Sequence, residues 1–276
     1  MRIALCNEVL AGMPLQRQCE VAAGLGYDGL EIAPFTLHDR PDEISGAEAA
    51  KVRAIVEASG LAVTGLHWLL VKPEGLSLTD PDAAVRSRTL EVMLRLTDLC
   101  AELGGKVLVH GSPKQRQIAP GETQAVALSR LRDALAHVAV AAARAGVVYC
   151  IEPLSRKETA LVNTIAEAAE LVRSIDHPNL RTMIDCSAAG LTEQESIASL
   201  IDRWLPTGLI AHVQVNDPNR RGPGQGETKF APILAALKRN NYAGVIAVEP
   251  FDYVPDGPTA AAFSAGYLRG LIEASG

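Results

Sequence analysis

The stretch VVYCIEP, residues 147–153, is an apolar run that ends in an acidic side chain, Glu152. Three later stretches end in a polar side chain in the same way: RTMIDCS (181–187) at Asp185, LIAHVQVND (209–217) at Gln214 and VIAVEPF (245–251) at Glu249. Successive members of this set are 33, 29 and 35 residues apart, which is about one strand-plus-helix unit of an α/β barrel. Oxygen ligands that end neighbouring parallel strands predict one divalent-cation site at their shared edge.

The same alternation of strand and helix patterns extends over the whole chain. Eight short apolar runs are typical of buried strands, at residues 3–5, 29–32, 62–66, 107–109, 147–151, 182–184, 210–215 and 245–248. Apolar residues recur at helical spacing in eight further segments, at 15–25, 47–59, 83–103, 122–145, 165–175, 193–204, 230–239 and 259–274. Eight strand-helix units in a row predict a (β/α)8 TIM barrel, and a single domain over residues 1–276.

A doubly wound open sheet would show the same alternation, but it would be expected to carry a glycine-rich phosphate loop after its first strand. Here that place is taken by CNEVLAGM, residues 6–13, which has no such pattern. We therefore expect the closed barrel, in which catalytic groups lie at the C-terminal ends of the strands. Glu152, Asp185, Gln214 and Glu249 all fall at predicted strand ends.

Composition and charge exclude several classes of partner. The net charge is −6 and no Lys/Arg run is longer than two residues, which argues against binding of nucleic acid. No apolar run approaches the roughly 18 residues of a membrane-spanning helix, so no membrane partner is expected. The N-terminal stretch reads as the first strand rather than as a signal peptide. Five cysteines without CxxC spacing predict neither a zinc knot nor disulfides, and favour a cytoplasmic location.

Four motifs occur in order along the second half of the chain: CIEP (150–153), MIDC (183–186), HVQVNDPNRRGPGQG (212–226) and VEPF (248–251). Together they resemble the xylose isomerase-like superfamily of sugar isomerases and epimerases, in particular its tagatose/psicose 3-epimerase and hydroxypyruvate isomerase branches. The resemblance implies that the metal is held by four residues, Glu152, Asp185, Gln214 and Glu249. It also implies that Glu152 and Glu249 act as acid and base.

The ligand on the seventh strand is the point at which this chain departs from the epimerases. Alignment of the Asn-Arg-Arg-x-Pro-Gly stretch puts Gln214 where the epimerases carry a ligating histidine and hydroxypyruvate isomerase-like members carry glutamine. His212 lies two residues earlier on the same strand face and is the alternative ligand. Ala188 stands where the epimerases carry a substrate-binding histidine. The resemblance therefore implies a small ketose or hydroxy-keto acid rather than a ketohexose in particular.

The chemistry implied for this site explains the residue types. Isomerisation or epimerisation next to a carbonyl removes a proton from carbon and passes through a cis-enediolate. A hard divalent ion such as Mn²⁺ or Mg²⁺, or alternatively Co²⁺ or Zn²⁺, neutralises the developing negative charge. Two glutamates on opposite sides of the barrel mouth can move the proton on opposite faces of the planar intermediate. The predicted activity is thus a metal-dependent sugar isomerase or epimerase.

The residues expected to contact the substrate lie on several strands and loops. By resemblance they are Glu158, after the fifth strand, and Arg220, in the loop after the seventh. His67 and His110 end the third and fourth strands; each either lines the pocket or is a hydrogen-bonded core histidine. His212 is the remaining candidate, as contact or as ligand.

Two other functions remain open for such a sequence, and a third, a phosphodiesterase, is not expected. A metal-dependent lyase or dehydratase of keto-sugars would use the same site, and a non-catalytic sugar-binding barrel would use the same fold. The intact pair Glu152 and Glu249 favours an enzyme. A phosphodiesterase resembling endonuclease IV needs more histidines for three zinc ions, and Ala188 and Gln214 replace two of them. We also expect a homo-oligomer, a dimer or tetramer, as is common for barrels of this kind.

Overall fold

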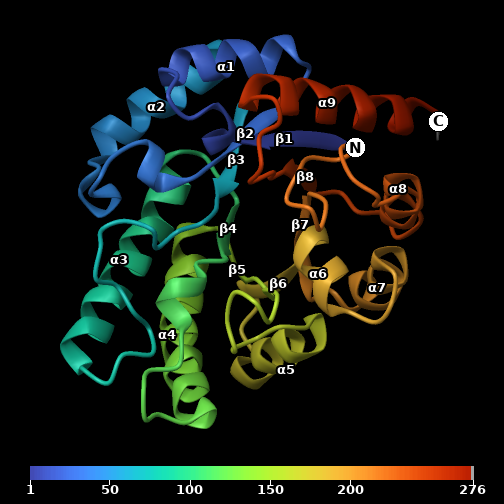
Figure 1. The fold of residues 1–276 in the computed structure, drawn as a ribbon. Helices are drawn as coiled ribbons and strands as arrows, with labels where there is room; N and C mark the ends of the chain where they lie inside the picture. Colours follow the sequence, from blue (N-terminus) through green and yellow to red (C-terminus); the bar gives the residue numbers. More distant parts are fainter. Residues whose placement is uncertain (275–276) are drawn as a thin grey trace.

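Eight parallel strands close into a barrel, in which each strand is hydrogen-bonded to the next and β8 to β1 (Figure 1). The structure, a computed structural model, describes residues 1–274. Within them the strands are β1 (Arg2–Cys6), β2 (Gly29–Ile32), β3 (Ala62–Leu66), β4 (Val107–His110), β5 (Val148–Ile151), β6 (Leu180–Asp185), β7 (Ile210–Val215) and β8 (Val245–Val248). The helices are α1 (Leu15–Gly24), α2 (Gly46–Ala58), α3 (Ala83–Glu102), α4 (Gln124–Ala145), α5 (Ile165–Ile175), α6 (Cys186–Thr192), α7 (Ile197–Trp204), α8 (Phe230–Arg239) and α9 (Gly257–Ala274).

Pairing between the first and last strands decides between the two folds that the sequence allows. Arg2 pairs with Val245 and Leu5 pairs with Val248, both in parallel. An open sheet would leave these two strands unpaired at its edges, so the predicted (β/α)8 barrel is confirmed. The helices form the outer ring around it (Figure 1).

The helices begin and end where their own sequences provide caps. Before α4, the Thr123 side chain accepts a hydrogen bond from the backbone N–H of Val126, and the helix ends at Gly146 with φ 69°, a conformation that glycine adopts without strain. Before α2, Ser45 and Glu48 form a complete capping box. None of the helices within the described residues is long and apolar enough to cross a membrane.

The segment after β6 differs from the sequence-based prediction of one helix over residues 193–204. The structure has two helices there, α6 and α7. The helix α6 begins directly after the strand because Oδ1 of Asp185 accepts a hydrogen bond from the backbone N–H of Ala188 at 2.6 Å. Glu193 has an extended backbone and ends α6, while Ser196 caps α7. The strand-end aspartate thus starts a helix that hydrophobic spacing alone did not indicate.

The barrel interior changes from apolar to polar toward the C-terminal ends of the strands. Its apolar part contains two clusters of buried residues, Ala4 with Cys6 and Ala247, and Val109 with Cys150 and Met183. Side chains two positions apart on a strand share a face, so the residues two positions beyond Cys150, Met183 and Ala247 also point inward. They are Glu152, Asp185 and Glu249, and the alternation therefore brings all three into the barrel mouth.

Candidate active site

Three carboxylates from strands β5, β6 and β8 meet at the mouth of the barrel. Asp185 is the last residue of β6, while Glu152 and Glu249 directly follow β5 and β8. One oxygen of each lies within 4.8 Å of those of the other two. All three residues are buried, with no more than 6% of each exposed. Closure of the barrel thus gathers residues that lie on three different strand-helix units.

When all three carboxylates are ionised, their negative charges repel one another. Burial, followed by the charges of Asp185 and Glu249, raises the pKa of Glu152 well above its usual value. Burial raises the pKa of Asp185 to about 6 and that of Glu249 to about 8. A divalent cation among them would remove the repulsion and favour the ionised form of each group.

Strand β7 contributes Gln214, whose side-chain oxygen accepts no hydrogen bond within the described residues. Gln214 lies beside Asp185 in the register of β6 and β7. Its Nε2 donates a hydrogen bond to Oε1 of Glu31 at 2.8 Å, and its Oε1 is buried with no partner within the described residues. His212 Nε2 lies 2.8 Å from the other oxygen of Glu31. Both candidates on this strand thus have a buried atom without a hydrogen bond within the described residues, but Nε2 of His212 is in ion-pair contact with Glu31, whereas Oε1 of Gln214 has no such contact.

The donor set fits one hard divalent ion. Three carboxylates and one amide oxygen provide only oxygen ligands, which Mg²⁺ and Mn²⁺ favour. The buried, unpartnered Oε1 of Gln214 and the repulsion among Glu152, Asp185 and Glu249 are both features that a bound cation would relieve. These four residues would hold it.

Asn216 belongs to the site although the sequence analysis did not single it out. Its Nδ2 donates to Oδ2 of Asp185 at 2.7 Å and to the backbone oxygen of Glu249 at 3.1 Å. Its Oδ1 accepts from the backbone N–H of Ser187 at 2.8 Å. Asn216 therefore orients Asp185. The available signal was its spacing of two residues from Gln214, which continues the inner face of β7 one residue past the end of the strand.

A second missed residue is Arg116, in the short 3-10 helix η4 (Pro113–Arg116) after β4. It is fully buried, and its Nη2 donates a hydrogen bond to the backbone oxygen of Glu152 at 2.7 Å. Its charge also counteracts the raised pKa of the Glu152 carboxyl. Nothing in the local sequence distinguishes this arginine from an exposed one.

A cavity of about 500 Å³ opens onto the three carboxylates. Its apolar wall contains Trp68 and Phe251, whose ring centroids are 5.5 Å apart in an edge-to-face contact. Ala188 and Leu191, from α6, complete the apolar lining on another side.

Two of the predicted substrate contacts line this cavity. Oε2 of Glu158 accepts hydrogen bonds from the backbone N–H and the hydroxyl of Ser155, at 3.1 and 2.7 Å. The guanidinium of Arg220 lies over the ring of Phe251, 5.2 Å from its centroid. Both side chains are exposed and therefore accessible to a ligand.

The three predicted histidines lie behind the cavity wall, and none is among its lining residues in the described part of the chain. His110 Nδ1 lies 2.8 Å from the hydroxyl of Tyr149, and burial together with the charge of Arg116 lowers its pKa to about 3. His212 contacts Glu31, as described above. His67 contacts Glu249. Their roles as substrate contacts stay predictions.

A closed eight-stranded barrel with acidic groups at the C-terminal strand ends defines an α/β-barrel enzyme. The chain belongs to the xylose isomerase-like TIM barrel family, whose model matches residues 19–271. It is 30% identical over 240 residues to the D-psicose 3-epimerase of Agrobacterium fabrum, which covers 84% of this chain and 78% of that protein. It is 28% identical over 256 residues to the L-ribulose 3-epimerase of Mesorhizobium japonicum, covering 91% and 81%.

The fold comparison agrees with the sequence relatives. The crystal structure of a D-psicose 3-epimerase in the presence of D-fructose superposes with a TM-score of 0.82 at 23% identity, and covers 98% of this chain and 99% of that one. This likeness concerns the fold. These two curated relatives are ketose 3-epimerases, and the chain is an enzyme of the isomerase class.

Proposed function

We propose that this protein is a divalent-metal-dependent epimerase or isomerase that acts on a small ketose or hydroxy-keto acid through a cis-enediolate. The observation that carries the proposal is the meeting of Glu152, Asp185 and Glu249 within 4.8 Å of one another, on the cavity of a barrel whose relatives are ketose 3-epimerases. Three ionisable groups in one buried place are suited to combining cation binding with proton transfer.

The two glutamates are the proposed acid and base. Glu152 reaches the cavity from β5 and Glu249 from β8, with β6 and β7 between them on one side of the barrel. Each can therefore address one face of a planar enediolate held in the cavity. When bound, the cation would polarise the substrate carbonyl and neutralise the charge that develops on its oxygen.

The cavity wall supports a small, oxygen-rich substrate. Trp68 and Phe251 offer an apolar face, and Glu158 and Arg220 offer hydrogen bonds to hydroxyl groups. Lys114 and Lys157 also line the cavity, and within the described residues neither forms an ion pair, nor does Arg220. These cations favour the hydroxy-keto acid among the two proposed substrate classes, because its carboxylate would bind to them.

The test is solvent deuterium incorporation, followed by NMR. Metal-stripped protein is incubated in D₂O with ketohexoses, ketopentoses, tetruloses or hydroxypyruvate, with and without Mn²⁺ or Mg²⁺. We expect label next to the carbonyl of one substrate only when metal is added. Glu152→Gln and Glu249→Gln should each slow turnover by roughly 10²- to 10⁴-fold, the usual contribution of a general acid or base.

The same spectra distinguish the alternatives. If the substrate loses water or a carbon fragment after exchange, the protein is a dehydratase or a lyase and not an epimerase. Tight metal binding with no exchange in any substrate would support a sugar-binding barrel instead.

Mn²⁺ or Mg²⁺ is the expected ion because all four proposed ligands are oxygens, with Co²⁺ and Zn²⁺ as weaker activators. The predicted dimer or tetramer is tested by sedimentation of the same preparation.

A further inference from the structure

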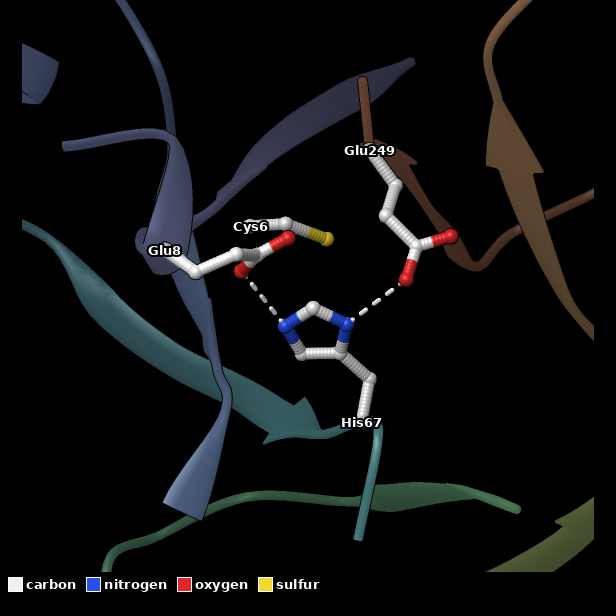
Figure 2. A group of neighbouring side chains, drawn as sticks. All are labelled: Cys6, Glu8, His67 and Glu249. Atoms are coloured by element: carbon white, nitrogen blue, oxygen red, sulfur yellow. Dashed lines mark hydrogen bonds and ion pairs between the residues drawn. The ribbon is translucent and has the colours of Figure 1, made fainter. Parts of the chain in front are cut away.

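His67 bridges two buried carboxylates. Its Nδ1 lies 2.8 Å from Oε1 of Glu249 and its Nε2 lies 2.9 Å from Oε2 of Glu8 (Figure 2). The histidine is fully buried, and Glu8, in the short 3-10 helix η1 (Asn7–Leu10), is 4% exposed. The ring nitrogen Nδ1 is hydrogen-bonded to Glu249, whereas the contact of Nε2 with Glu8 is close but does not have hydrogen-bond geometry, so it acts through charge.

The two proposed catalytic glutamates are held differently. Oε1 of Glu249 is tied to the ring of His67, and its other oxygen points away from the ring (Figure 2). The carboxylate of Glu152, by contrast, accepts no hydrogen bond from any residue in the range 1–274. The backbone of Glu152 is held, since its oxygen accepts from Arg116 and its N–H donates to the backbone oxygen of His110. Within the described residues, one carboxylate is thus held by a hydrogen bond and the other is not.

Glu8 and His67 do not reach the cavity themselves. Neither is among the described residues that line it, whereas Glu249 is. The Cys6 thiol lies close enough to Glu8, His67 and Glu249 for the four to hold a metal ion of their own. Such an ion would, however, have to replace one of the two contacts that the ring already makes at 2.8 and 2.9 Å. The hydrogen bond of the ring to Glu249 and its ion-pair contact with Glu8 therefore favour a chain of contacts over a second metal site.

We propose that Glu8 and His67 are positioning residues, which hold the carboxylate of Glu249 in one orientation and leave its second oxygen to face the cation and the substrate. Carboxylate ligands of metals are commonly oriented by such hydrogen bonds, and loss of the partner typically weakens metal affinity or activity by about 10- to 100-fold. The inference rests on the proposed function only in taking Glu249 as a ligand and base.

The first test needs no substrate. Binding of Mn²⁺ to the metal-stripped protein is measured by EPR of the free ion. His67→Leu removes the donor to Glu249 and should weaken binding by about tenfold or more. His67→Asn keeps an amide N–H near the position of Nδ1 and should restore most of the affinity. Glu8→Gln should weaken binding less than His67→Leu, and adding it to His67→Leu should cause no further loss because Glu8 acts through the ring.

Tyr149→Phe is the matched control. It also removes a buried contact to a barrel histidine, His110, at 2.8 Å, but this contact does not involve Glu249. Its Mn²⁺ affinity should equal that of the native protein. Equal weakening in Tyr149→Phe and in the His67 variants would overturn the proposal, as would native affinity in both His67→Leu and Glu8→Gln. If His67→Leu fails to fold, Glu8→Gln decides the same question.

Two further readouts separate a positioning role from other roles. In His67→Leu at saturating Mn²⁺, deuterium exchange should persist with one epimer, deprotonated by Glu152, while interconversion is lost. Equal loss of exchange from both epimers under this condition would overturn the proposal. The native protein loaded with Co²⁺ should show no thiolate absorption band. A band that disappears in Cys6→Ser would show that the cluster of Cys6, Glu8, His67 and Glu249 binds a metal ion itself. Failure of the native protein to turn over any substrate would refute the proposed function, whereas the Mn²⁺ measurements would still decide this inference.

Discussion

At the scale of single residues, the site depends on a glycine that carries no chemistry. Gly111 follows β4, and a Cβ placed on it would lie 1.9 Å from Oε2 of Glu152. The backbone of Gly111 is not in the left-handed region, so the space, and not the conformation, requires glycine here. The absent side chain is what admits the free carboxylate of Glu152 to the barrel mouth.

Gly111→Ala is therefore expected to displace Glu152 while the fold persists, because the end of a glutamate side chain can move. We expect Mn²⁺ affinity and substrate exchange to fall by roughly 10- to 100-fold, as for other disturbed ligand shells, with a melting temperature close to native. The control is Gly266→Ala in α9, where no atom lies within 4 Å of the added Cβ. It should stabilise the helix by about 0.5–1 kcal/mol and leave metal binding unchanged. Native metal affinity in Gly111→Ala would contradict the steric argument.

At the scale of elements, the loop after β7 presents Arg220 from a strained backbone. Arg220 has φ 71°, and its backbone oxygen accepts hydrogen bonds from the N–H groups of Phe251 and Asp252, both at 2.8 Å. The buried carboxylate of Asp217 accepts from the N–H of Thr228 at 2.8 Å across the same loop. The loop is thus bonded to itself and to the segment after β8, which holds Arg220 over the cavity.

Comparison of Arg220→Ala with Arg220→Gly separates this strain from substrate binding. Glycine accepts the positive φ without the steric cost that alanine keeps, so the glycine variant should be the more stable by about 1 kcal/mol. Both variants lose the same guanidinium and should raise KM alike. Urea unfolding gives the first quantity and steady-state kinetics the second. A glycine variant less stable than the alanine variant would show that the loop bonds do not impose the backbone conformation.

At the scale of the whole molecule, the metal-free protein keeps a group of carboxylates that resist ionisation. The pKa of Asp185 is raised from 3.8 to about 6 and that of Glu249 from 4.5 to about 8. Because these folded-state values lie above the unfolded ones, the folded state binds more protons than the unfolded state. The associated stability is present at low pH and is lost as the pH rises from about 4 to about 8.

A divalent cation should reverse this dependence, since it binds the ionised carboxylates of the folded state only. We expect the rise in melting temperature on addition of Mn²⁺ to be small at pH 5 and several-fold larger at pH 8. Thermal unfolding of metal-free and metal-loaded protein across this range is the measurement. A larger shift at pH 5 than at pH 8 would contradict the assignment of the carboxylates as ligands.

The sequence by itself determined the barrel and the outline of its acidic site. Strand and helix periodicity are local properties, and eight such units without a phosphate loop leave few folds. The carboxyl ends of parallel strands in a barrel lie at one end. Residues that end apolar runs, such as Glu152, Asp185 and Glu249, were therefore predictable as neighbours before any contact was known.

Only the tertiary structure decided which groups surround those residues. His67 and Glu249 are 182 positions apart, and their contact depends on how β3 faces β8 across the closed barrel. Arg116 and Gly111 act on Glu152 through space between adjacent strands, for which their local sequences hold no signal. The start of α6 depends likewise on Asp185, whose carboxylate caps that helix. Periodicity specifies which face of an element is buried, but the partner on that face follows from the register and closure of the whole barrel.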